Sequence, residues 1–200
     1  MRLPVRVEPL AGMTPDIDYR WDPDTDILSA RVRAPEAAER VLALPTADER
    51  GDLEDPVART LRFGPDDALT GIVELEGRDG SWIVLDVERG RLAGVEVAIW
   101  PNDRRRRELA PPADVEDALV RLPGRRRGLA PGAHPTSPLE VPTHVTAESD
   151  PGERIIHFRL GPVRAARSVR LGRDLLVDVD AQGHLAGLWL LNVPPVPTVT

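Results

Sequence analysis

One unit is written twice in this chain, and that repeat constrains the fold more than any other feature. Residues 83–97 read IVLDVERGRLAGVEV, and residues 175–190 read LLVDVDAQGHLAGLWL. Their Asp-Val, Gly and Leu-Ala-Gly positions coincide once a single residue is gapped in the turn. Internal repetition predicts architecture before any other signal does, so we expect two halves of similar fold.

The repeat extends upstream of these two stretches. Residues 21–32 match residues 149–160 at an offset of 128, and the alignment runs on to Val41 against Val169. In the block that begins at Ile83 the offset has fallen to 92 or 93. The first half therefore holds about 35 extra residues, which we place within an insertion at 45–80.

Alternating apolar and polar residues predict half-buried antiparallel strands in both halves. Leu28, Ala30 and Val32 alternate with polar residues, and so do Ile156 and Phe158, a period of two that is typical of strands with one solvated face. Further strands are expected at 81–87, 92–100, 174–179 and 185–193, and an added hairpin at 59–63 and 71–76. The predicted fold class is mainly β, with two similar small antiparallel β-meander units.

A proline- and arginine-rich stretch separates the two units. We assign residues 1–100 to the first unit, 101–142 to a linker and 143–200 to the second unit. Within the linker, Val115, Ala118, Leu119 and Leu122 recur at helical spacing, which predicts one short helix at 113–122. The linker also carries the arginine runs 104–107 and 125–127, which we interpret as a solvated linker or as a strap that docks onto the acidic first half.

Composition excludes several classes of protein. With no cysteine, the chain has no disulfide framework, no thiol nucleophile and no thiolate metal site. The opening residues MRLPVRVEPL lack a long apolar run, so we expect a cytoplasmic protein with no membrane partner. Residues 1–100 carry 12 arginines against 21 acids, and so acidic a first half argues against a nucleic-acid partner, because binding phosphates needs a basic face.

The repeated residues also carry a resemblance to a known family. An Asp-Pro pair, an alternating strand and then Val-Asp-Val-Asp-x-x-Gly-x-Leu-x-Gly resemble the domain-of-unknown-function 2283 family of short bacterial proteins. Both halves resemble it, over roughly residues 19–100 and 145–193. The resemblance implies a small β fold, a bacterial source and an association with antitoxins or partner-binding modules, and it assigns no catalytic residue. The family's acid after the second glycine is kept as Glu96 but is replaced by Trp189 in the second half.

Two acidic turns resemble the start of a calcium loop but lack its key ligand. The stretches that begin at Asp22 and Asp178 have Arg33 and Trp189 at position twelve, where such a loop needs a bidentate acid. We interpret these acids as turn residues. The four histidines show no metal-ligand spacing, and His157 is expected to be exposed on the polar face of its strand. We therefore predict no metal, no cofactor and no catalytic residue.

The strand around Trp189 is apolar on both faces, so we expect it to be covered on both sides, by the other half or by a partner. One hypothesis is a non-enzymatic protein-binding module, antitoxin-like, with a protein partner or a second copy of the chain. The alternative is an enzyme or small-ligand-binding protein with a carboxylate-lined site between the two repeats. The candidate partner or ligand surface comprises Asp86, Glu96, Asp178, His157, His184 and Trp189.

Overall fold

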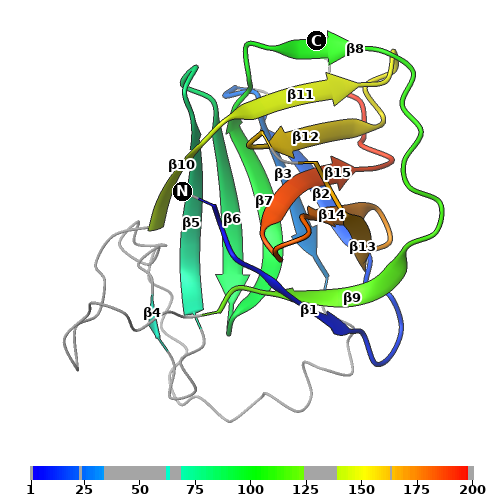
Figure 1. Cartoon of the computed structure of the whole chain (residues 1–200). Coiled ribbons are helices and arrows are strands. Elements are labelled where there is room, and N and C mark those ends of the chain that lie inside the picture. Colours follow the sequence, from blue (N-terminus) through cyan, green and yellow to red (C-terminus); the bar gives the residue numbers. More distant parts are fainter. Residues whose placement is uncertain are drawn as a thin grey trace, which may run out of the picture.

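The strands of this protein curl into one continuous sheet around a shared core (Figure 1). The computed structural model describes residues 2–22, 24–33, 62–63, 69–123, 139–162 and 164–197. In that part of the chain there is no helix, and so none that is long and apolar enough to cross a membrane. The strands are β1 Arg6–Pro9, β2 Ile17–Asp22, β3 Ile27–Val32, β4 Arg62–Phe63, β5 Leu69–Gly77, β6 Trp82–Glu88, β7 Arg91–Ile99, β8 Arg104–Arg106, β9 Glu116–Arg121, β10 Leu139–Thr143, β11 Val145–Ser149, β12 Ile156–Leu160, β13 Arg167–Gly172, β14 Leu175–Val179 and β15 Leu185–Leu190.

Two groups of five antiparallel strands have the same order and the same register. The first is β2-β3-β7-β6-β5, and the second is β11-β12-β15-β14-β13. Leu28 lies opposite Val97 in the first group, and Ile156 lies opposite Leu190 in the second. All four residue pairs of β3–β7 recur in β12–β15, 128 positions later on one strand and 93 on the other. Both groups have a register shift directly after the repeated aspartate of β6 or β14.

Strand β5 is equivalent to β13, which changes where the extra residues lie. Ile72 lies opposite Asp86, and Ser168 lies opposite Asp178, so Val169 corresponds to Val73 and not to Val41. Residue 41 itself lies outside the described residues. The predicted insertion 45–80 was therefore wrong at its C-terminal end, because 69–77 is a common strand of the sheet. Of the added hairpin, the described residues of β4 pair with the start of β5.

Each half completes the edge of the other. Strand β10 lies parallel to β5, with Leu139 opposite Val73 and Thr143 opposite Gly77, and the chain then continues into β11 of the second group. In the opposite direction, the Arg173 amide donates to the Pro15 carbonyl just before β2. We refer to the contact between β5 and β10 as the seam. The two predicted units are thus parts of one sheet with one core.

The predicted helix at 113–122 is wrong, since its residues form strand β9. Ala118 and Val120 are buried, as is Leu122 just beyond the strand, while the residues between them are partly exposed, which is the period of a strand. Strand β9 pairs with β1 on one side and runs parallel to β13. These long-range partners override the local helical spacing.

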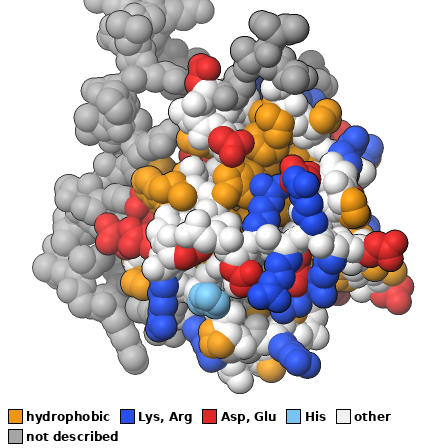
Figure 2. All heavy atoms as spheres, turned by 90° about the horizontal axis from the view of Figure 1, so that it is seen from above, with side chains coloured by type: hydrophobic (Ala, Val, Ile, Leu, Met, Phe, Trp, Pro, Cys, Tyr) orange, Lys and Arg blue, Asp and Glu red, His pale blue; other side chains and the backbone are white. Residues whose placement is uncertain are grey.

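The first arginine run forms strand β8 at the edge of the second group. It lies parallel to β11, and its charges are paired: Arg104 and Arg106 contact Glu153, and Arg107 contacts Glu148. Figure 2 shows arginine side chains gathered beside acidic ones on this face of the molecule. The strap therefore docks on the second half rather than on the first. The run 125–127 lies outside the described residues.

Candidate functional site

Three of the predicted site residues meet in a buried polar network on the second half, which we call the Asp178 network. His157 Nε2 lies 2.9 Å from Asp178 Oδ2, and Trp189 Nε1 donates to the same oxygen at 3.1 Å. Ser168 Oγ donates to the other carboxylate oxygen. The His157 and Trp189 rings are stacked, with their centroids 3.9 Å apart. His157 is only 7% exposed, so the expectation that it is exposed was wrong.

The geometry of the Asp178 network indicates that it stabilises the packing of the second half. A nucleophilic serine must hydrogen-bond a base, but here Ser168 and His157 both bind the same carboxylate instead of each other. Gly187 allows this close packing, because a Cβ there would lie 2.8 Å from both Asp178 Oδ2 and the Phe158 carbonyl oxygen. The Asp178 carboxylate is thus hydrogen-bonded through both oxygens, as a buried charged group requires.

The equivalent face of the first half is an open groove. Register places Ser29, Ile72 and Glu96 where the second half has His157, Ser168 and Trp189. All three donors to the aspartate are therefore missing, and the carboxylate of Asp86 makes no hydrogen bond or ion pair to another residue that the structure describes. The groove has a volume of about 230 Å³ and is lined by both predicted acids, Asp86 and Glu96. The structure does not bring these two acids together with Asp178.

The remaining predicted residue, His184, belongs to a turn. Asp180 Oδ1 accepts hydrogen bonds from the backbone amides of Gln182 and His184, and its second oxygen contacts the His184 ring. Burial alone would raise the pKa of Asp180, but these hydrogen bonds outweigh it and the pKa is lowered. Asp22 and Asp150 accept amide hydrogen bonds in the same way. Asp22 and Asp180 shape turns, as the sequence predicts, whereas Asp178, which was interpreted in the same way, is buried in strand β14.

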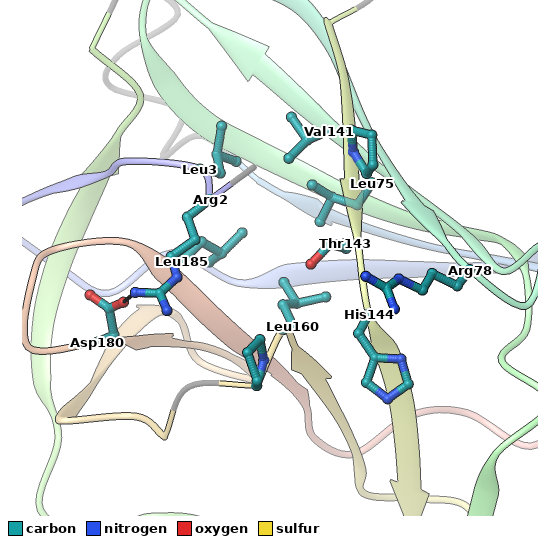
Figure 3. Close-up of a pocket in the computed structure, with 13 residues that line it drawn as sticks. Arg2, Leu3, Leu75, Arg78, Val141, Thr143, His144, Leu160, Asp180 and Leu185 are labelled. Atoms are coloured by element: carbon teal, nitrogen blue, oxygen red, sulfur yellow. Dashed lines mark ion pairs between the residues drawn. The ribbon is translucent and has the colours of Figure 1, made fainter.

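A cavity of about 570 Å³ opens at the seam (Figure 3). Its wall is apolar and draws on both halves: Leu75 comes from β5, Val141 from β10, Leu160 from β12 and Leu185 from β15, together with Leu3 near the N-terminus. All five side chains are buried members of the common core. We call this space the seam cavity, and its volume is typical of sites for small molecules.

Polar groups stand only at the edge of the seam cavity. Arg2 is turned toward Asp180 on one side, at 3.7 Å, and Arg78 and Thr143 lie on the other side, near His144 (Figure 3). None of the carboxylates predicted to line a site between the halves borders it. Sequence reasoning missed Arg78 and Thr143, because nothing in their local pattern shows that β5 and β10 become neighbours. It also missed Ser168, although Ser168–Leu171 alternates as a strand.

One group of carboxylates in the described part of the chain is close enough to share a metal ion. The oxygens of Glu74, Glu76 and Glu140 lie within 4.8 Å of one another on the solvent side of the β5–β10 seam. Partial burial raises the pKa of Glu74, and the charges of Glu140 and Glu76 raise it further. Glu76 and Glu140 are exposed. The group is a source of repulsion within the sheet.

Replacing Asp178 tests the structural role of the network. Asp178→Ala removes the acceptor of two buried donors and of the partly buried Ser168 hydroxyl, so we expect it to lower the free energy of unfolding by about 3 kcal/mol. Asp86→Ala, at the equivalent position, is the matched control and is expected to cost less than about 1 kcal/mol. Urea denaturation measures both. Equal losses for the two variants would contradict the assigned role.

Replacing Glu140 tests the repulsion across the seam. At pH 7 the variant Glu140→Gln removes one of three like charges, and we expect a melting temperature about 1–3 °C higher. A carboxyl whose pKa is raised by folding destabilises the protein once it ionises, so the gain is expected to vanish as the pH falls through the pKa of Glu74. Glu108→Gln, an exposed loop residue, is the control. A gain that persists unchanged in acid would refute this explanation.

Comparison with known proteins leaves the function to be inferred from these contacts. No family model matches the chain, and no curated protein matches it either.

Proposed function

We propose that this chain is a non-enzymatic binding protein, and that the seam cavity is its site for a small ligand. The observation that carries the proposal is a solvent-open cavity of about 570 Å³ whose apolar wall is formed by core residues of both halves. The cavity opens to solvent beside exposed residues such as Arg78 and His144. A ligand with an apolar body would displace water from its apolar wall, which supports a role as a binding site.

The polar clusters favour binding over catalysis. In the one buried histidine–carboxylate cluster of the described part of the chain, His157, Ser168 and Trp189 all bind the Asp178 carboxylate. The mouth of the seam cavity pairs its single carboxylate, Asp180, with Arg2 and His184. A general base must lie within hydrogen-bond reach of the proton it takes up. Neither His157 nor His184 lines the seam cavity.

A protein partner is the second candidate function, favoured by the groove on the first half. Asp86 and Glu96 face outward there, at positions where the second half is closed by its own side chains. An acidic groove suits a basic segment of a partner protein, as an antitoxin-like module would require. If this candidate is right, the double variant Asp86→Asn with Glu96→Gln loses a salt-sensitive complex with an arginine-rich peptide. Unchanged binding by that variant would rule the groove out.

We also infer that the two halves arose by duplication of one β-meander. The common registers and the shared register shift after Asp86 and Asp178 support this inference. Kinship with the domain-of-unknown-function 2283 family, a bacterial source and a cytoplasmic location stay predictions from the sequence.

Blocking the cavity tests the proposed function. Three ten-carbon probes of equal chain length serve as ligands: decanoate, decanol and decyltrimethylammonium, each below its micelle concentration. We expect at least one probe to bind with a stoichiometry of one by native mass spectrometry and calorimetry. Thr143→Trp places an indole at the cavity and is expected to abolish that binding, whereas Thr146→Trp, on β11 outside the cavity, keeps it.

Both tryptophan variants need intact folds, which circular dichroism and thermal melting establish. If the wild-type protein binds none of the three probes, the proposed function fails. Equal binding by Thr143→Trp and the wild-type protein would place the ligand elsewhere and would contradict it as well.

A further inference from the structure

The charge at the mouth of the seam cavity identifies the class of ligand. We propose that the cavity binds an amphipathic anion, with a medium-chain carboxylate as the chemical class, and that Arg78 and Thr143 hold its head group. This inference rests on the proposed function, because it names the ligand of that same cavity.

The apolar walls of the seam cavity favour a ligand with an apolar body. Leu75, Val141, Leu160 and Leu185 are each at most 7% exposed and present only hydrocarbon to the cavity. An alkyl chain gains from leaving water for such a surface, whereas a polar body would lose its hydrogen bonds there. The ligand is therefore apolar over most of its length.

One cation at the mouth remains uncompensated. Arg2 is paired with Asp180, which also contacts His184, so those charges cancel locally. Arg78 makes no ion pair or hydrogen bond to another residue that the structure describes, and Figure 3 shows its guanidinium directed toward the cavity beside Thr143. A guanidinium presents two parallel N–H donors that match a carboxylate, and the threonine hydroxyl adds a third donor.

The acids of the same sheet edge do not offset Arg78 inside the cavity. Glu74, Glu76 and Glu140 alternate with the buried Val73, Leu75 and Val141 along β5 and β10. Successive side chains of a strand point to opposite faces, so these carboxylates project from the solvent side of the sheet. An anionic head group at the mouth of the cavity therefore lies on the side of Arg78 and not on the side of these carboxylates.

The same three probes decide the class of ligand. We expect decanoate to bind at least about tenfold more tightly than decanol or decyltrimethylammonium, since a charge-assisted pair contributes that much. Arg78→Gln is expected to remove most of this advantage and to reduce the affinity for decanol far less than the affinity for decanoate. Thr143→Val removes the hydroxyl and nearly keeps the size of the side chain, and it is expected to lower the affinity for decanoate a few-fold. Arg91→Gln changes an exposed arginine of β7 that does not line the cavity and is the control.

Different binding results would contradict the anion assignment and the proposed function. Equal affinity for all three probes, or a preference for the cationic probe, would overturn the anion assignment while the cavity stands as a ligand site. Undiminished decanoate binding by Arg78→Gln would overturn it too. Binding of no probe at all overturns both proposals.

Discussion

The parallel pairing of β5 with β10 is the contact on which the rest of the structure depends. Five consecutive residue pairs, from Leu139–Val73 to Thr143–Gly77, join an edge of the first half to the chain that enters the second. At the other edge of the first group, side chains of β2 donate to the second half: the Tyr19 hydroxyl to the Asp174 carbonyl, and the Trp21 indole to the Pro194 carbonyl. Without the seam, both halves would expose strand edges and part of their apolar faces.

Sharing one core also explains why a cavity lies at the seam. A repeated unit can pack its own interior by the same rules in each copy, but the boundary between copies has no equivalent inside either of them. Here the boundary is lined by core residues of both halves, with Arg78 and Thr143 at its mouth. The seam thus holds the sheet together and provides the space that we assign to a ligand.

The outer faces of the two halves show how equivalent positions can diverge. An aspartate occupies the same place in each register, yet Asp178 is enclosed by three donors and Asp86 faces an open groove. Asp178 is enclosed because the second half has His157, Ser168 and Trp189 at these positions. The first half has Ser29, Ile72 and Glu96 there, and Asp86 stays open. A buried carboxylate that is hydrogen-bonded through both oxygens holds its neighbours in one arrangement, whereas a carboxylate in an open groove can bind a cationic group of a partner.

The sequence predicted the strands well where their pattern is local, and poorly where distant contacts decide. The alternation at Ile156–Leu160 and the repeated Leu-Ala-Gly marked true strands of the sheet. Residues 116–121 fit a helical and a strand period equally, and only pairing with β1 and β13 selects the strand. Alternation placed His157 on the outer face, but its burial follows from Trp189 and Asp178. The seam cavity is lined by segments that are far apart in the chain, so no local sequence pattern predicts it.

Native-state hydrogen exchange under increasing urea tests most directly whether the two halves form one cooperative unit. We expect the amides of β6 in the first half and β14 in the second to lose protection together, with the same free energy and the same dependence on urea. Exchange of either strand at a urea concentration where the other stays protected would contradict it, because the halves would then be separate domains that merely touch.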